Sequence, residues 1–246
     1  MIKAGIDIGS RTIKLVLRQG DETLHAEVRE NTFNTLEVCN EMLNGYQYDS
    51  ITATGYGRHL FAEKFNAKVI SEISAFAMGI HRVYPGVRTI LDIGGQDTKA
   101  ISVDAAGNLM KFEMNDKCAA GTGRFLEIMA MALRFNLKEF GENALAASES
   151  ENVNSMCTVF AESEVISLLA TGADRQKVAK GIHQSVIRRA VALIKRVGIK
   201  DDVAFVGGVA HNVAMRQFLE DALSKKVLVP SNPQVIGALG CTFAGK

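Results

Sequence analysis

The sequence contains one pattern twice, and this repeat constrains the fold more than any other feature. Residues 1–19 read MIKAGIDIGSRTIKLVLRQ, and residues 87–104 read VRTILDIGGQDTKAISVD. Each copy has an apolar strand, the triplet Asp-Ile-Gly, a small or polar turn, and a lysine (Lys14 or Lys99) shortly after the aspartate. A further strand follows in each copy. Because the period is about 85 residues, the pattern predicts a duplicated domain and not a solenoid of short repeats.

Strand-like and helix-like segments alternate along the chain, which predicts an α/β protein. Strands are expected at 1–9, 12–20, 23–30, 50–57, 203–208 and 226–230, and residues 68–84 pass from strand into helix. Helices are expected at 34–45, with Gly45 as the C-cap, and at 122–135, 158–170 and 175–197. We expect an N-terminal lobe at 1–85 and a C-terminal lobe at 86–246, with the final helix, 235–246, able to pack back on the N-terminal lobe.

The charge balance argues against a nucleic-acid or membrane-surface partner. The chain has 28 Lys+Arg and 27 Asp+Glu, so its net charge is +1. The first residues include Asp7 and no apolar run typical of signal peptides, and no stretch approaches the roughly 18 apolar residues of a membrane span. We therefore expect a cytoplasmic protein, whose four cysteines do not form structural disulfides.

The two Asp-Ile-Gly turns predict a clamp for phosphate groups. A glycine directly after a strand lets backbone N–H groups approach an anion, and an aspartate at the strand end can hold Mg²⁺ or orient an attacking water. The candidates in the first turn are Asp7, Gly9, Ser10, Arg11, Thr12, Ile13 and Lys14. Those in the second are Asp92, Gly94, Gly95 and Gln96, and a third glycine turn, VGGVAHN, adds Gly207, Gly208 and Asn212. Asp7, Asp92 and Gln96 are the candidate catalytic residues.

A single turn of this kind is usually no more than a tight turn, but two copies in a duplicated frame favour phosphate binding. The chain has no Walker A sequence, and no GxGxxG motif opens its first helix, which argues against P-loop and Rossmann folds. The pattern resembles the actin, Hsp70 and sugar-kinase superfamily along essentially the whole chain. This resemblance implies two related, ribonuclease H-like lobes with β-β-β-α-β-α-β-α cores that close on ATP and open on ADP. It also implies that the two Asp-Ile-Gly loops grip the phosphates, that VGGVAHN holds the adenosine, and that Gln234 touches the nucleotide.

Two cysteines stand directly before helices. Cys118 lies in MNDKCAAGTGRF and Cys157 in SMCTVFAESEV. Such thiols are either buried side chains or ligands, and spacing alone favours neither, whereas Cys39 and Cys241, inside helices, are expected in the core. One chain offers two good ligands where a zinc or iron–sulfur site needs four, so a twofold dimer would complete the set. Free N–H groups and the positive dipole ends at the helix starts would stabilise an anionic cluster.

The segments around these cysteines resemble the activator ATPases of 2-hydroxyacyl-CoA dehydratases, which belong to the BadF/BadG/BcrA/BcrD-type ATPase family. ATGYGR at 53–58 and DIGGQD at 92–97 are similar to the same family. The resemblance implies a homodimer with one [4Fe–4S] cluster, held by Cys118 and Cys157 of each chain. It implies that hydrolysis of Mg-ATP drives a low-potential electron into a partner iron–sulfur dehydratase or reductase, with ferredoxin or flavodoxin as a fitting electron donor. The chain departs from the family at Arg11, where a small residue or threonine is common.

Two other functions stay open at this point. A small-molecule kinase of the same fold would need a substrate-binding lobe, for which 246 residues leave little room. A zinc-stapled, actin-like assembly protein would use the same four interface thiols. Glu162 and Glu164 fit either an acidic helical turn exposed to solvent or a contact to a partner or nucleotide. Arg188, Arg189, Lys195 and Arg196 are expected on a solvated face of the helix at 175–197.

Overall fold

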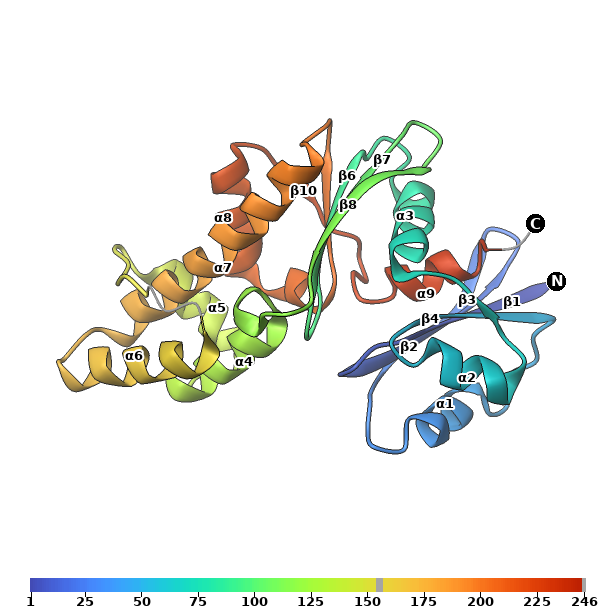
Figure 1. Cartoon of the computed structure of the whole chain (residues 1–246), viewed down its shortest axis with the longest axis horizontal. Coiled ribbons are helices and arrows are strands. Elements are labelled where there is room, and N and C mark those ends of the chain that lie inside the picture. The colour runs from blue at the N-terminus through green and yellow to red at the C-terminus, as the bar shows by residue number, and fades with distance from the viewer. Residues whose placement is uncertain (154–156, 245–246) are drawn as a thin grey trace.

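The computed structural model describes residues 1–153 and 157–244 and contains two five-stranded sheets (Figure 1). The first sheet has the order β3-β2-β1-β4-β5, and the second has the order β10-β9-β6-β7-β8. The strands of the first sheet are β1 (Ile2–Ile8), β2 (Thr12–Gln19), β3 (Glu22–Glu30), β4 (Ser50–Gly55) and β5 (Lys68–Val69). Those of the second sheet are β6 (Thr89–Ile93), β7 (Thr98–Val103), β8 (Leu109–Asn115), β9 (Val203–Val206) and β10 (Val227–Leu228).

The two sheets share one topology, which confirms the duplicated α/β core. In each sheet the first three strands pair antiparallel, and the first strand pairs parallel with the fourth. The register repeats as well, because Asp7 pairs with Lys14 across β1 and β2, and Asp92 pairs with Lys99 across β6 and β7. The sequence repeat is therefore a repeat of hydrogen-bonding register, and it places both Asp-Ile-Gly turns at equivalent ends of their sheets.

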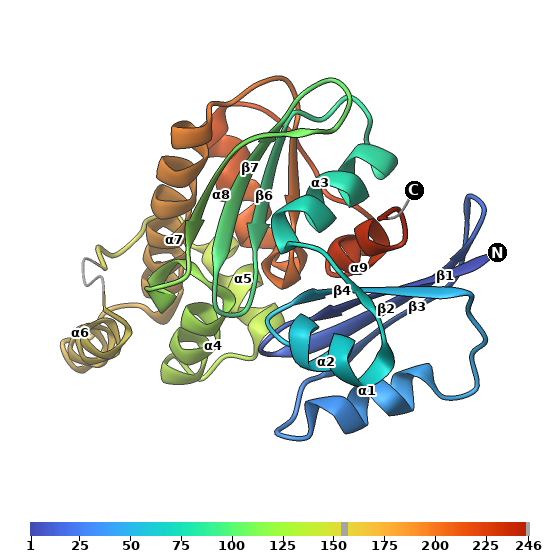
Figure 2. The same cartoon turned by 45° about the vertical axis from the view of Figure 1, so that its right-hand side comes forward.

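Helices separate and cover the two sheets (Figures 1 and 2). The helices are α1 (Thr35–Leu43), α2 (Arg58–Phe65), α3 (Glu72–Val83), α4 (Gly123–Ala132), α5 (Leu137–Ala146), α6 (Thr158–Ala170), α7 (Arg175–Val197), α8 (Val213–Leu223) and α9 (Ile236–Cys241). Helices α1 and α2 cover one face of the first sheet, and α3 and α9 lie between the two sheets. Helices α7 and α8 cover the outer face of the second sheet, while α4, α5 and α6 extend the structure beyond it.

The C-terminal helix α9 packs against β1 and α3 at very short range. A side chain at Gly5 would overlap the carbonyl of Ala238, and one at Gly240 would overlap the carbonyl of Ala75. Beyond α9, Arg18 Nε donates to Thr242 Oγ1 at 2.9 Å, which ties the end of the chain to β2. Small residues on both sides therefore let the last helix return to the N-terminal sheet.

The long helix α7 shows how the core of the second half forms. Asp174 caps its first turn by accepting from the N–H groups of Gln176 and Lys177, and Gly198 ends it with φ +82°. The expected apolar stripe is confirmed, since Val186, Ala190, Ile194 and Val197 are buried. This stripe packs in one cluster with residues of α4, α5, α8 and the second sheet.

Some expected elements differ in extent. Helix α2 was not expected, because Phe61 is its single buried residue and its apolar periodicity is weak. Helix α5 was also not expected, although Asn136 and Glu139 form a capping box at its start. The C-cap of α1 is Asn44, and Gly45 follows it with φ +84°. The final helix ends at Cys241 and not at 246, and residues 245–246 lie outside the described part of the chain.

No helix within residues 1–153 and 157–244 is long and apolar enough to cross a membrane.

Candidate functional site

A cavity of about 580 Å³ opens where the two Asp-Ile-Gly turns approach each other. Its size suits a nucleotide-sized ligand. The predicted residues that line it are Asp7, Gly9, Ser10, Arg11, Thr12, Lys14, Asp92, Gly94, Gly95, Gln96, Gly207, Gly208, Asn212 and Gln234. Ile13 does not line it, because alternate residues of a strand point to opposite faces and its side chain is fully buried in the core of the first sheet.

The two hairpin turns have the same backbone geometry. Gly9 N–H donates to the carbonyl of Thr12 at 3.0 Å, and Gly94 N–H donates to the carbonyl of Asp97 at 2.9 Å. At each turn the strand-end aspartate faces the lysine opposite it, with Lys14 Nζ 3.3 Å from Asp7 Oδ2 and Lys99 Nζ 3.3 Å from Asp92 Oδ2. Each turn thus presents one carboxylate and one ammonium group near the cavity.

The two lysines differ in their surroundings. The Lys99 ammonium contacts three carboxylates, those of Asp97 at 2.6 Å, Glu72 at 2.9 Å and Asp92 at 3.3 Å, and its side chain is 4% exposed. Burial by itself lowers the pKa of Lys99, but the three carboxylates outweigh this and raise it. Lys14 has Asp7 as its ion-pair partner and is 14% exposed. The sequence repeat makes the two lysines equivalent, whereas the structure makes Lys99 a fixed counter-ion and leaves Lys14 more accessible to an anion.

Asp92 is a buried carboxylate next to this cation. Burial raises the pKa of Asp92 to about 6, with Lys99 acting against the rise and Asp97 adding to it. Tyr56, in the turn after β4, donates to Asp97 Oδ2 at 3.2 Å, and burial followed by the charge of Asp97 raises the Tyr56 pKa to about 12. Asp97, Tyr56 and Glu72 were not predicted as site residues. The DIGGQD and ATGYGR segments were the signal for Asp97 and Tyr56, whereas Glu72, at the start of α3, lies in neither segment.

A second pair of equivalent glycines supports the two aspartates. Gly55 after β4 has φ +89°, and Gly207 after β9 has φ +86°. A side chain at Gly55 would crowd the Ile8 carbonyl and Asp7 Oδ1, and one at Gly207 would crowd the Ile93 carbonyl and Asp92 Oδ1. Each glycine therefore packs its backbone directly on the strand end that carries the aspartate. Gly207 was predicted as a site residue, whereas its counterpart Gly55 was not.

The third glycine turn meets the cavity on its far side. Gly207 N–H donates to the carbonyl of Pro233 at 3.0 Å, which brings Gln234 against Gly208. Asn212 lines the cavity, but its Oδ1 caps α8 by accepting from the N–H groups of Ala214 and Met215. The turn is thus rigid and pre-formed, as a nucleotide-binding surface should be.

His183 fixes the other end of the Asn212 amide. His183 is fully buried, its Nε2 lies 3.0 Å from Asn212 Nδ2, and its Nδ1 lies 2.7 Å from the carbonyl of Ala179. Burial lowers the pKa of His183 to about 4, so the ring is neutral, donates from Nδ1 and accepts at Nε2. Both polar ends of the Asn212 side chain therefore have partners inside the protein.

The four thiols fall into two classes. Cys118 and Cys157 are exposed, while Cys39 and Cys241 are buried, as expected for the two cysteines placed inside helices. Burial raises the pKa of Cys39 to about 12 and raises that of Cys241 as well. Within residues 1–153 and 157–244, no group of three or more His, Cys, Asp or Glu side chains is arranged to hold a metal ion.

The turn after Cys118 is tied to the second hairpin. Cys118 is the N-cap of a short 3₁₀ helix (Ala119–Gly121), which leads directly into α4. The N–H groups of Gly123 and Arg124 donate to the carbonyls of Gly94 and Gly95 at 2.8 and 2.9 Å. The expectation that the first N–H groups of this helix are free for an anion is therefore wrong for these two, because the carbonyls of the Gly94–Gly95 turn accept hydrogen bonds from them.

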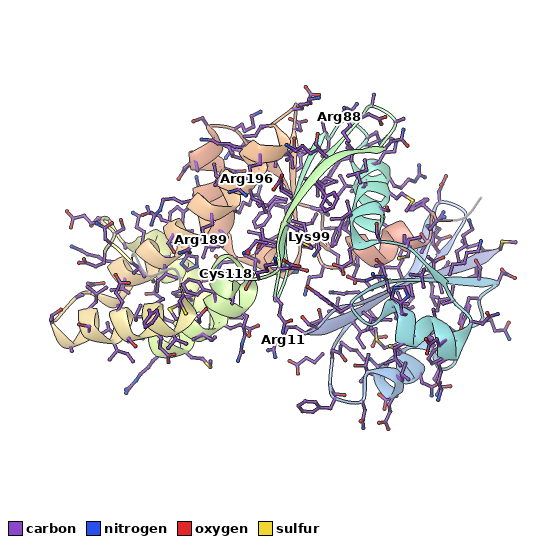
Figure 3. All side chains as sticks on the ribbon, in the orientation of Figure 1. Arg11, Arg88, Lys99, Cys118, Arg189 and Arg196 are labelled. Atoms are coloured by element: carbon purple, nitrogen blue, oxygen red, sulfur yellow. The ribbon has the colours of Figure 1, made fainter. Side chains whose placement is uncertain are left out.

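Arg189 holds the same turn from α7. Its Nη1 donates to the carbonyl of Ala120 at 2.7 Å, and Figure 3 shows its side chain beside Cys118. Burial lowers the pKa of Arg189, and the charge of Cys118 acts in the opposite direction. Arg188, Lys195 and Arg196 are exposed as predicted, but Arg189 is half-buried and belongs to the Cys118 turn and not to the solvated face.

Comparison with known proteins shows which family the chain belongs to. A model of the BadF/BadG/BcrA/BcrD ATPase family matches residues 4–245. The chain belongs to this family. The ATPase is 44% identical to the activator of lactoyl-CoA dehydratase from Anaerotignum propionicum, over 99% of this chain and 96% of the relative.

Solved structures agree with this assignment. The activator of 2-hydroxyisocaproyl-CoA dehydratase from Clostridium difficile, with bound ADPNP, is 38% identical to the ATPase and superimposes with a TM-score of 0.91, over 99% of this chain and 94% of that one. A ROK family glucokinase from Streptomyces griseus matches with a TM-score of 0.63 at 11% identity, over 99% of this chain and 98% of that one, which reflects the fold alone. The predicted actin-like and sugar-kinase-like fold is therefore confirmed.

Proposed function

We propose that the chain is an ATP-dependent activator that delivers low-potential electrons to a partner iron–sulfur enzyme, such as a 2-hydroxyacyl-CoA dehydratase or a related reductase. The observation that carries the proposal is the position of Cys118: an exposed thiol sits on a turn whose next helix hydrogen-bonds the second phosphate loop. The relatives named as dehydratase activators, which match along nearly the whole chain, support the same assignment.

In this proposal ATP lies between the two hairpins, in the cavity lined by both Asp-Ile-Gly turns. Backbone N–H groups of the turns and the Lys14 ammonium bind phosphate oxygens, while Gly207, Gly208 and Gln234 face the adenosine. Asp7 and Asp92 would hold Mg²⁺ or its water ligands, because buried carboxylates at strand ends are suitable oxygen donors. Gln96 is exposed at the tip of the second turn, where its amide orients the attacking water.

Cys118 and Cys157 are the thiols that would hold a [4Fe–4S] cluster. Both are exposed and each is the N-cap of a helix, whereas the other two thiols are enclosed in the core. Two thiolates fill half of the ligand set, so the proposal requires a homodimer with the cluster shared between protomers. When bound, the cluster would act as a one-electron donor. Val159 and Phe160, in the first turn of α6 next to Cys157, are each 68% exposed and offer apolar area to the second protomer or the partner enzyme.

The hydrogen bonds around Cys118 explain how nucleotide and thiol would be coupled. A shift of the Gly94–Gly95 turn on phosphate binding would move the N-terminus of α4, because two of its N–H groups donate to that turn. Thr98 Oγ1 also donates to the carbonyl of Gly121 at 2.6 Å, so the Cys118 turn is joined to β7 as well. Changing the position and hydrogen bonding of a cluster ligand changes the reduction potential of the cluster.

The remaining assignments follow from this activity. We propose that residues 1–85 and 86–246 act as two lobes that close on ATP, with the C-terminal helix bridging back to the first. Ferredoxin or flavodoxin is the proposed electron donor, and the cytoplasm is the proposed location. We propose that Glu162, which is exposed on α6, contacts the partner enzyme.

Anaerobic purification tests the proposal, with iron counting and visible spectra before and after dithionite. The expected result is a dimer with about two irons per chain and an absorbance that reductant bleaches. Cys118→Ser and Cys157→Ser should each lose the iron, while Cys39→Ala, a change at a buried thiol, should retain it. A colourless protein that binds zinc, or no metal, with all four cysteines intact would contradict the proposal.

A further inference from the structure

Arg11 connects the two halves of the nucleotide site. It lies in the β1–β2 turn, yet its Nη2 is 3.3 Å from Glu127 Oε2 on α4, and both residues line the cavity. Its aliphatic stem crosses the second hairpin, since a Cβ built on Gly95 would lie 2.7 Å from Arg11 Cγ. Figure 3 shows Arg11 where the tip of the first sheet approaches the second. This side chain is therefore a direct link from the first phosphate loop to α4.

The link is easily broken. The side chains of Arg11 and Glu127 are 50% and 26% exposed, and exposed ion pairs contribute little to stability because water competes for both charges. Glu127 also has a second cation, since Arg124 Nη1 donates to the same Oε2 at 2.8 Å from within α4. If Arg11 moves away, the Glu127 carboxylate still has a charged partner.

A terminal phosphate would offer Arg11 a stronger interaction. Guanidinium groups bind phosphate oxygens in bidentate geometry, and such charge-assisted pairs are stronger than a single exposed contact to a carboxylate. The other cations of the two hairpins are more enclosed in their ion pairs, since Lys14 is 14% exposed beside Asp7 and Lys99 is 4% exposed among three carboxylates. Within residues 7–14 and 92–99, Arg11 is the cation whose ion pair is most exposed.

We propose that Arg11 distinguishes ATP from ADP by leaving Glu127 for the terminal phosphate. The inference rests on the proposed function in that it requires the nucleotide to lie between the two hairpins. With ADP, Arg11 stays on Glu127 and α4 remains attached to the first hairpin. With ATP, Arg11 turns to the phosphate, and α4 keeps its N–H bonds from Gly123 and Arg124 to the second hairpin alone. Arg11 is thus a specificity-determining residue that also reports the nucleotide state to the helix that follows Cys118.

Calorimetric titration of the full chain tests this, with ADP and a non-hydrolysable ATP analogue in the presence of Mg²⁺. We expect Arg11→Gln to lower the affinity for the analogue about tenfold and the affinity for ADP less than about twofold. The variant loses one charge-assisted interaction, and only the analogue makes that interaction. Arg11→Lys should recover part of the preference. Glu127→Gln should raise the affinity for the analogue when Arg11 is present. It should not raise this affinity when it is combined with Arg11→Gln.

Arg124→Gln is the opposing variant, because it removes the other cation from the same Glu127 oxygen, and its side chain does not line the cavity. Arg11 would then leave Glu127 without a charged partner, so binding of the analogue should weaken relative to ADP by about twofold to fivefold, the opposite direction to Glu127→Gln. A second readout is hydrogen exchange of the 119–127 segment. The segment should exchange faster with the analogue than with ADP in the wild type, and equally with both in Arg11→Gln.

The outcomes separate the two hypotheses. If the wild type binds neither nucleotide, the proposed function fails. If the wild type binds both, and Arg11→Gln weakens ADP and the analogue equally or changes neither, the nucleotide site stands and the role of Arg11 is overturned.

Discussion

The carboxylate of Asp92 and the ammonium of Lys99 lie 3.3 Å apart in a site where their side chains are 3% and 4% exposed. Asp7 and Lys14 have the same spacing at the equivalent point of the first sheet, but they are more exposed. Removal of water strengthens every charge interaction in the second pair and makes it costly to leave either charge alone. The two halves of the duplicated site therefore differ in energetics, although their backbone geometry is the same.

Lys99→Met should destabilise the protein far more than Lys14→Met. The first substitution leaves three carboxylates around an apolar side chain, and breaking a buried ion pair costs about 3–5 kcal/mol. The second leaves one carboxylate, that of Asp7, without its cation beside the cavity, so it should reduce ATP hydrolysis while costing about 1–3 kcal/mol. Urea unfolding and ATPase assays of both variants give the comparison, and equal losses of stability would contradict it.

Gly207→Ala should cost more stability than Gly172→Ala. Both glycines have a positive φ, +86° and +90°, so both substitutions introduce backbone strain of about 1–2 kcal/mol. Gly172 has open space around it, whereas a side chain at Gly207 would overlap Asp92 Oδ1 and the carbonyl of Ile93. The difference between the two unfolding free energies measures the close approach alone, and it should be accompanied by loss of nucleotide binding in Gly207→Ala.

His183 should make the protein less stable as the pH falls. Burial lowers its pKa from 6.5 to about 4 in the folded state, so between these values the unfolded chain binds the proton and the folded chain does not. The stabilisation is complete above pH 6.5 and is lost progressively towards pH 4. Between pH 7.5 and pH 5 the loss is about 2 kcal/mol.

The measurement is urea unfolding of the wild type and His183→Gln at both pH values, with the proton resonances of the five histidines followed by NMR. The variant should show a smaller pH dependence by about the same 2 kcal/mol. A His183 ring that titrates near pH 6.5 in the folded protein would refute the prediction.

In iron-free protein, two thiols should react quickly with iodoacetamide and two should react slowly. Cys118 and Cys157 are exposed and should react with iodoacetamide within the folded state. Cys39 and Cys241 are buried with raised pKa values, so they should react only after unfolding. Peptide mapping by mass spectrometry assigns the four rates. Rapid labelling of Cys39 in the folded protein would mean that α1 is not packed as described.

Much of the fold was predictable because it depends on local patterns. The repeat of strand, Asp-Ile-Gly and lysine predicted two sheets with equivalent turns, and both sheets have that register. Helix α2 escaped prediction because a single buried residue, Phe61, anchors it. Helix α5 was predictable from its capping box and from the buried face of Phe140, Gly141 and Ala144, but it was missed.

The sequence by itself determined the α/β duplication, the two Asp-Ile-Gly turns and the two cysteines that precede helices, because each is a contiguous pattern of residue types. The tertiary structure decided which residues of the two repeated segments have equivalent surroundings. It enclosed Lys99 between Glu72, Asp92 and Asp97 while leaving Lys14 accessible, since Glu72 comes from α3, outside the repeated segment. It also brought Arg11 to Glu127 and joined Gly94 to Gly123, contacts between residues far apart in sequence that only the packing of α4 against both hairpins creates.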